Sequence, residues 1–393
     1  MRKIHVVIAT LLLASVVLSA CAPAAGTNAS ASEPKVVEVT RVVQGTPVVE
    51  TIVVTVPVAE ATQGAAAGSI AMNGAGATFP FPLYSRWFYE YAFVDPSVKF
   101  NYQSIGSGGG IKQITEKTVD FGASDAILND EQYTAAPGIQ MFPTVAGAVV
   151  PTYNVSELKD KEPLVLDSAT LSNIFLGKIT KWNDPAIAAL NPNSTLPNKD
   201  IIVVHRSDGS GTSFIFTSYL SAVSEEWKNT VGASTSVEWP VGLGGKGNEG
   251  VAGTVSQNDG GIGYVELAYA KQNKLAIAKM INAAGNTVEA AISSTQNAMA
   301  DFGGEMPDTL ARVIVNAPGK DSWPIAGYTY LLVYMEQTDC VKGQKLVQFM
   351  KWALTDGSTF AEQLDYVPLP ENVRQLVFTK LEDLTCNGKP LGQ

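Results

Sequence analysis

Strand-like and helix-like patterns of hydrophobic positions alternate along the chain. In "VKFNYQ" (Val98 to Gln103) apolar and polar residues alternate, which predicts a strand with one buried face, and the following "GIKQI" (Gly110 to Ile114) spaces two isoleucines three positions apart, as in a helix. The apolar run "IIVVH" (Ile201 to His205) followed by "SFIFTSYL" (Ser213 to Leu220) repeats this order. Repeated strand, glycine-rich turn and helix predict an α/β protein whose binding groups gather at strand ends and helix starts.

The pattern of the first residues indicates a secretory signal peptide. Arg2 and Lys3 precede an apolar run from Val6 to Leu18, which is too short for a comfortable membrane span. The run ends in Leu-Ser-Ala-Cys, which resembles the bacterial lipobox and predicts a signal over residues 1–20 and lipid attachment at Cys21. We therefore expect an extracytoplasmic protein anchored to a membrane surface, the alternative being a signal followed by a chance cysteine.

Residues 21–69 differ in composition from the rest of the chain. Ala, Thr, Ser, Gly and Val dominate here, and "VVEVT" at Val36 is loosely echoed by "VVETI" at Val48. We expect a tether that holds a folded body clear of the membrane. The Val and Thr runs leave open a second interpretation, in which part of the tether pairs as a short hairpin.

Composition narrows the classes of function. The chain has 393 residues, 46% of them hydrophobic, and a net charge of −10, so it is long enough for two lobes and gives no sign of nucleic-acid binding. After Cys21 only Cys340 and Cys386 remain, a pair that permits a disulfide in an oxidising compartment, although two free thiols stay open. Of the two histidines, His5 lies in the signal, which argues against histidine-rich metal sites.

Four stretches combine glycine with hydroxyl or charged residues. They are "GAGATFP" (Gly74 to Pro80), "GSGGG" (Gly106 to Gly110), "FGASD" (Phe121 to Asp125) and "RSDGSGT" (Arg206 to Thr212). A helix start offers unpaired backbone N–H groups and a positive dipole end, so glycine-flanked Ser and Thr there suit a tetrahedral oxyanion. The plainer interpretation is that Thr78, Ser107 and Ser210 only cap helices.

Familiar motifs do not fit these stretches. "GAGATF" lacks the third glycine of a dinucleotide fingerprint, and in "GLGGKGN" Lys246 is followed by glycine, which excludes a Walker site. Neither Ser107 nor Ser210 stands in the G-x-S-x-G turn of hydrolases. His205 is close to Ser210 in the sequence but has no evident reason to face it, and we interpret it as a strand-end residue outside the site.

The same stretches resemble the phosphate-binding receptors of bacterial ABC phosphate importers. The resemblance runs from about Ile70 to the end of the chain and rests on these segments: "GAGATFPFPLYSRW", "YQSIGSGGGIKQI", "VDFGASDAIL", "LGKITKWNDPAI", "SDGSGTSFIFTSYL", "EEWKNTVG", "WPVGLGGKGNEGV", "GIGYVELAYAKQN" and "SWPIAGYTYLLV".

The resemblance implies a binding site by position. Its phosphate ligands would be Thr78, Phe79, Ser107, Asp125, Arg206, Ser210, Gly211 and Thr212. Arg206 would supply the one positive charge, held by the supporting residue Asp208. The Asp125 carboxylate would accept a proton from phosphate and repel sulfate, which has none to offer.

The resemblance also implies a type II-like periplasmic-binding-protein fold with two α/β lobes and the ligand in the cleft between them. Lobe I would hold residues 70–154 and 331–393, lobe II residues 155–330, with hinge crossings near Asn154 and Leu331. We expect a monomeric, non-enzymatic receptor without cofactor or metal, whose partners are inorganic phosphate, the permease subunits and their cytoplasmic ATPase. Two alternatives are a surface phosphohydrolase using Ser107 or Ser210 with a metal, and a receptor or sensor for another tetrahedral oxyanion.

Overall fold

The computed structural model describes residues 37–43, 46–52, 69–303 and 306–391. The chain divides into two compact units, residues 1–64 and 65–393, which are taken separately below. In the first unit, β1 (Val37–Val43) and β2 (Thr46–Ile52) pair antiparallel, so the hairpin interpretation of the tether is the one observed. The expected signal and Cys21 lie outside the described residues.

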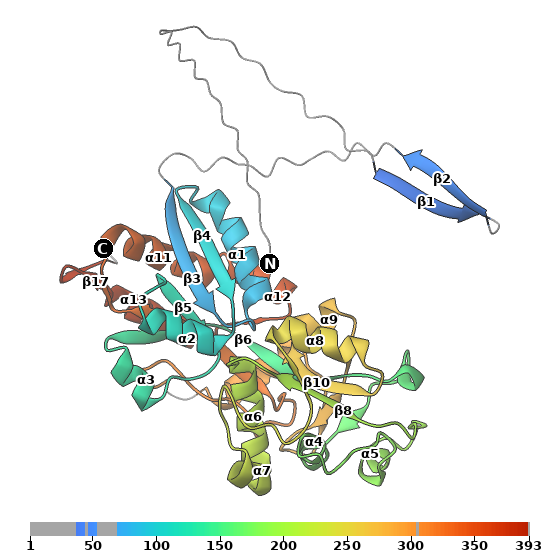
Figure 1. The fold of residues 1–393 in the computed structure, drawn as a ribbon. Helices are drawn as coiled ribbons and strands as arrows, with labels where there is room; N and C mark the ends of the chain where they lie inside the picture. Colours follow the sequence, from blue (N-terminus) through green and yellow to red (C-terminus); the bar gives the residue numbers. More distant parts are fainter. Residues whose placement is uncertain (1–36, 44–45, 53–68, 304–305, 392–393) are drawn as a thin grey trace, which may run out of the picture. The chain divides into compact units, whose positions relative to one another are not determined.

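One long sheet organises the second unit (Figure 1). The strand order is β4-β3-β5-β14-β6-β10-β8-β9, and β11 and β16 also pair with β6. The strands are β3 (Ile70–Gly76), β4 (Val98–Ser104), β5 (Phe121–Ser124), β6 (Ile139–Asn154), β8 (Ile202–Arg206), β9 (Leu243–Gly245), β10 (Gly261–Glu266), β11 (Ala276–Ile277), β14 (Ala326–Tyr334) and β16 (Val367–Pro368).

Two parallel groups of strands lie at the two ends of this sheet. β3 pairs parallel with β4 and β5, and β8 pairs parallel with β9 and β10. Between them the antiparallel strand β6 pairs with β14 over residues 139–148 and with β10 over residues 149–154. β6 therefore changes partner between Ala148 and Val149, a few residues before the crossing expected near Asn154, and the division into lobes stays a prediction.

Helices and two small sheets complete the unit. The helices are α1 (Phe81–Val94), α2 (Ser107–Thr115), α3 (Asp130–Ala135), η1 (Ser156–Leu158), α4 (Ser168–Phe175), α5 (Pro185–Leu190), α6 (Gly211–Val223), α7 (Glu225–Thr230), α8 (Gly247–Gln257), α9 (Leu267–Gln272), α10 (Ile292–Asp301), α11 (Cys340–Ala353), α12 (Ser358–Gln363) and α13 (Glu371–Glu382). β7 (Val165–Leu166), β12 (Lys279–Ile281) and β13 (Thr287–Val288) form one small sheet; β15 (Glu336–Gln337), β17 (Thr385–Cys386) and β18 (Lys389–Pro390) form the other. Within the described residues no helix is both long and apolar enough to cross a membrane.

The core is continuous and rich in aromatic side chains. On α1, Tyr91 packs edge-on against Phe349 of α11, with ring centroids 5.2 Å apart. At the other end of the sheet, Phe216 of α6 stacks on Tyr264 of β10 at 4.2 Å. These contacts hold α1 against α11 and α6 against β10.

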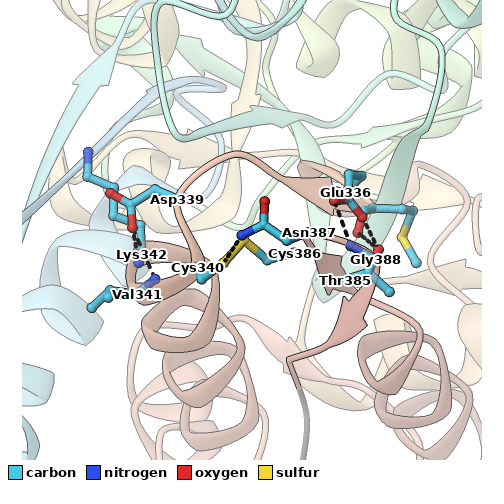
Figure 2. The surroundings of a disulfide bond; sticks show 10 residues. Glu336, Asp339, Cys340, Val341, Lys342, Thr385, Cys386, Asn387 and Gly388 are labelled. Atoms are coloured by element: carbon cyan, nitrogen blue, oxygen red, sulfur yellow. Dashed lines mark hydrogen bonds between the residues drawn. A yellow bond between two sulfur atoms is a disulfide. The ribbon is translucent and has the colours of Figure 1, made fainter.

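A disulfide bond joins Cys340 to Cys386, 46 residues apart in the sequence (Figure 2). Cys340 opens α11, whose start is capped by the Asp339 carboxylate accepting from the backbone N–H groups of Val341 and Lys342 at 3.0 and 3.1 Å. Cys386 lies on β17. The bond that the cysteine count permitted is thus present, and it ties the last strands to α11.

Candidate functional site

Polar groups at the starts of four helices lie in one buried region. α1 and α2 follow the parallel strands β3 and β4, and α6 and α8 follow the parallel strands β8 and β9 (Figure 1). Because the carboxyl ends of parallel strands lie at one edge of a sheet, the helix starts that follow them gather there as well. The polar residues at these starts are buried: Thr78, Ser107, Arg206, Ser210, Thr212 and Asn248.

The start of α2 contacts the start of α6. Ser107 Oγ accepts hydrogen bonds from the Gly211 N–H at 3.0 Å and from the Asp125 N–H at 3.2 Å, and the Gly108 N–H donates to the Gly209 carbonyl at 2.9 Å. A Cβ on Gly211 would lie 2.5 Å from both Ser107 Oγ and Asp125 Oδ2, so only glycine fits there. Residues more than a hundred positions apart are therefore in direct contact.

Arg206 is held by Asp208. Nε donates to Oδ1 at 2.8 Å and Nη2 to Oδ2 at 2.6 Å, while Oδ1 also accepts from the Gly247 N–H at 3.0 Å. Burial alone would raise the pKa of Asp208, but the hydrogen bonds and charge of Arg206 outweigh it and bring the pKa below its usual value. Asp208 is thus a carboxylate, and the guanidinium is fixed in direction.

Asp125 follows β5 and is a buried acid. Its Oδ1 accepts a hydrogen bond from the Thr329 hydroxyl at 2.7 Å. Burial raises the pKa of Asp125 from 3.8 to about 7, although the Thr329 hydrogen bond, the Arg206 charge and Ser107 each act to lower it. Near neutral pH this group can therefore either hold or accept a proton.

The backbone before α1 is fixed by two tyrosines. The Thr78 carbonyl accepts from the Tyr269 hydroxyl, and the Phe79 carbonyl accepts from the Tyr366 hydroxyl, each at 2.6 Å. Thr78 Oγ1 accepts from the Asn248 backbone N–H at 3.2 Å and from Asn248 Nδ2 at 2.8 Å. The segment that opens α1 is thereby tied to the start of α8.

Of Thr78, Ser107 and Ser210, which the plainer interpretation treats as helix caps, only Ser210 caps the helix that follows it. Ser210 is the N-cap of α6, where its Oγ accepts from the Ser213 N–H at 3.0 Å. The N-cap positions of α1 and α2 are Pro80 and Gly106 instead, and neither helix has a side-chain cap. Thr78 and Ser107 are buried polar groups that do not cap these helices.

Sequence reasoning missed Asn248, Thr329, Tyr269 and Tyr366. Asn248 is fully buried at the start of α8, directly after Gly247, whose φ of +73° lies in the left-handed region that favours glycine. A glycine before a polar residue at a helix start is the same signal that singled out the other stretches. The sequence interpretation of "GGKGN" tested it as a nucleotide motif and included it in the family resemblance, but assigned no role to Asn248.

Neither histidine-based nor metal chemistry gains support from the described residues. His205 stacks on Trp239 with ring centroids 4.9 Å apart, and its Nδ1 lies 3.0 Å from the Arg206 carbonyl, so it faces neither Ser107 nor Ser210. Among residues 69–303 and 306–391 no group of three or more His, Cys, Asp or Glu side chains is placed to hold a metal. The cluster offers one cation, Arg206, paired with the Asp208 carboxylate, a second acid, Asp125, whose pKa is raised, and many neutral donors.

Comparison with known proteins points to one group. A family model described as a PBP superfamily domain matches residues 42–357. A Pasteurella multocida protein named "Phosphate-binding protein PstS" is 47% identical over 324 residues, which cover 82% of this chain and 93% of the relative. A protein of the same name from Methanocaldococcus jannaschii is 36% identical over 332 residues, covering 78% and 85%.

Solved structures agree on the fold. The crystal structure of an ancestral soluble variant of the human phosphate-binding protein superposes with a TM-score of 0.64 at 20% identity, covering 82% of this chain and 99% of that one. The phosphate-bound, high-affinity periplasmic phosphate-binding protein PfluDING gives a TM-score of 0.61 at 20% identity, covering 79% and 93%. At this identity the likeness concerns the arrangement of the chain and not its ligand.

Proposed function

This chain belongs to the PstS family of phosphate-binding proteins in the PBP superfamily, and we propose that it captures inorganic phosphate outside the cytoplasm and delivers it to an ABC permease. It has the α/β fold of periplasmic binding proteins, and it is the substrate-binding component of a transport system and not an enzyme. The partners in delivery are the permease subunits and the cytoplasmic ATPase that drives them.

One observation carries the assignment of the site. Ser107, Asp125, Arg206 and Thr212 come from three different segments of the chain, yet they form one buried group. In this group the Gly211 N–H donates to Ser107 Oγ, and Arg206 Nη1 donates to the Thr212 hydroxyl. Buried polar groups at several helix starts around a single cation suit a small tetrahedral anion. We therefore assign phosphate to this cluster, with Thr78, Phe79, Ser210 and Gly211 as its further ligands.

Asp125 is the element that selects phosphate. Near neutral pH phosphate retains at least one OH, which can donate to a carboxylate, whereas sulfate has none. Because its pKa is about 7, Asp125 can ionise near neutral pH at a small cost in free energy when the phosphate OH donates a hydrogen bond to it. Sulfate would place a second uncompensated negative charge beside the acid in a site with little water.

Ligand binding is coupled to closure of the cleft. Lobe I would consist of residues 70–154 and 331–393 and lobe II of residues 155–330, so Thr78, Ser107 and Asp125 face Arg206 to Thr212 from opposite sides. The hydrogen bonds between the starts of α2 and α6 support this proposal, because they would join the two lobes. Phosphate would stabilise this form by its differential affinity for the two states, and the closed form is what a permease can recognise.

Attachment to the membrane is proposed from the first residues. Cleavage after residue 20 would leave Cys21 as the lipid-bearing amino terminus, and residues 21–69 would connect it to the folded unit. The protein would act as a monomer at the membrane surface. Mass spectrometry of the membrane fraction tests this proposal, because a Cys21→Ser variant should lose both the lipid mass and the membrane association.

A crystal structure with phosphate tests the proposed site. The expected ion contacts the Arg206 guanidinium, the hydroxyls of Ser107 and Thr212, and the Asp125 carboxylate. Crystals of an Arg206→Met variant grown under the same conditions serve as the control and should lack the ion. A phosphate bound only at other residues would contradict the assignment.

A further inference from the structure

Asn248 joins two hydroxyls of the cluster. Its Nδ2 donates to Thr78 Oγ1 at 2.8 Å and to Thr212 Oγ1 at 3.1 Å, which uses both amide hydrogens. The side chain is fully buried, so water does not compete for these bonds. The residues that it connects lie 170 and 36 positions away in the sequence.

The direction of the Asn248 amide is fixed from its other side. Oδ1 accepts a hydrogen bond from the backbone N–H of Glu266 at 2.9 Å. Exchanging the oxygen and nitrogen of the amide would set two donors against each other at this point. The amide therefore turns its oxygen to Glu266 and its NH₂ group to the two threonines.

These hydrogen bonds determine whether the hydroxyls of Thr78 and Thr212 can donate or accept further hydrogen bonds. Thr78 Oγ1 accepts from Asn248 Nδ2 and also from the Asn248 backbone N–H at 3.2 Å, and Thr212 Oγ1 accepts from Asn248 Nδ2 and, at 3.4 Å, from Arg206 Nη1. A hydroxyl oxygen has two lone pairs and one proton, so both oxygens have used their acceptor capacity. Any further hydrogen bond that either hydroxyl makes must be one that it donates.

We propose that Asn248 is a positioning residue that makes Thr78 and Thr212 obligate hydrogen-bond donors toward phosphate, an inference that rests on the function proposed above. Two fixed donors pair with unprotonated phosphate oxygens. The protonated oxygen is then directed to the one acceptor opposite, Asp125. Asn248 thus sets the orientation of the anion without touching it.

Isothermal titration of the purified protein with inorganic phosphate tests the proposal. Asn248→Ala frees both hydroxyls to rotate, and we expect the Kd to rise about tenfold to a hundredfold, which corresponds to one or two hydrogen bonds. Asn248→Asp has the same shape but only accepts, so it takes the threonine protons and adds a negative charge. We expect its loss of affinity to exceed that of the alanine variant.

The decisive readout is the coupling between Asn248 and the threonines. In a Thr78→Val/Thr212→Val background the hydroxyls are absent, so adding Asn248→Ala should change the Kd less than about threefold. A merely structural asparagine would cost the same factor in both backgrounds, and that result would overturn the proposal. The Asn248→Asp variant gives a second measurement if the alanine variant folds poorly.

A matched control is Asn282, another buried asparagine. Its Nδ2 donates to the carbonyls of Gly319, Lys320 and Ser322, away from the cluster. Asn282→Ala should lower the melting temperature and leave the Kd for phosphate unchanged. If the unmodified protein fails to bind phosphate, the proposed function itself fails; if it binds and the Asn248 variants bind equally well, only this inference fails.

Discussion

Arg206 and Asp208 face each other in a two-point ion pair, with Nε on Oδ1 at 2.8 Å and Nη2 on Oδ2 at 2.6 Å. Only 1% of the arginine side chain and 13% of the aspartate side chain are exposed. The pair occupies one edge of the guanidinium and leaves Nη1 directed at Thr212. The Arg206 guanidinium, the single cation of the cluster, is therefore oriented before a ligand binds.

Replacing Arg206 with methionine should weaken phosphate binding by about 2–5 kcal/mol, because the anion and the neighbouring carboxylates lose their buried partner. Arg206→Lys keeps the charge but not the planar fork, and should recover only part of the loss. Titration calorimetry of the three proteins measures both effects. Equal affinities for Arg206→Met and the unmodified protein would refute a ligand role for this arginine.

Asp208→Asn should affect stability more than binding. The buried guanidinium loses its counter-charge, and we expect the free energy of unfolding to fall by about 3 kcal/mol. Phosphate affinity should change by less than about 1 kcal/mol, because removing a negative charge near the anion offsets the looser positioning of Arg206. Denaturant unfolding and calorimetry measure the two quantities.

The exposed pair of Lys181 and Asp200 supplies the control for this variant. Its ions are 2.7 Å apart, but 45% and 76% of their side chains are exposed. Asp200→Asn should therefore cost less than about 1 kcal/mol of stability. An equal loss of stability in Asp208→Asn and Asp200→Asn would mean that the buried Arg206–Asp208 pair contributes no more to stability than the exposed pair.

The pKa of Asp125 predicts how stability depends on pH in the absence of phosphate. Burial raises this pKa to about 7, so between about pH 4 and 7 the folded protein binds more protons at Asp125 than the unfolded chain does. This group therefore lowers stability as the pH rises through that range, by on the order of a few kcal/mol.

Comparison with Asp125→Asn isolates this contribution. The other carboxyl groups remain in the variant, including Glu266, whose pKa burial also raises. The variant should gain stability relative to the unmodified protein between pH 5 and pH 7 in thermal unfolding. A difference that stays constant with pH would contradict the raised pKa.

The disulfide between Cys340 and Cys386 should stabilise the protein without influencing its ligand. Closing 46 residues of sequence restricts the unfolded chain by about 4 kcal/mol in the chain-entropy model. A Cys340→Ser/Cys386→Ser variant should melt at a lower temperature and bind phosphate with unchanged affinity. A reducing agent should lower the melting temperature of the unmodified protein but not that of the variant; a variant that melts at the same temperature would disprove the stabilising role.

Local patterns predicted the elements that carry the site. The alternation in "VKFNYQ" corresponds to β4, and the helix expected from Ser213 to Leu220 corresponds to α6, which extends to Gly211–Val223. These predictions succeeded because period and turn residues are short-range signals. The sequence did not predict where β6 changes partner, because a strand buried along nearly its whole length has no alternation to mark that point.

The contacts that position the site residues join distant parts of the sequence, so local sequence patterns did not predict them. Asn248 meets Thr78 170 positions away, and Thr329 meets Asp125 204 positions away. Nothing in the sequence around Asn248 or Thr329 indicates these partners. The first contact depends on how helix starts after different strands come together, and the second on the antiparallel pairing of β14 with β5. The resemblance to a family supplied candidate ligands and the supporting residue Asp208, but it did not supply Asn248 or Thr329.

Titration of the purified protein with inorganic phosphate and with sulfate at neutral pH tests the central claim most directly. We expect saturable, one-to-one binding of phosphate and negligible binding of sulfate, with discrimination reduced in Asp125→Asn because an amide can donate to an unprotonated oxygen. Equal affinities for the two anions, or no binding of phosphate, would contradict it.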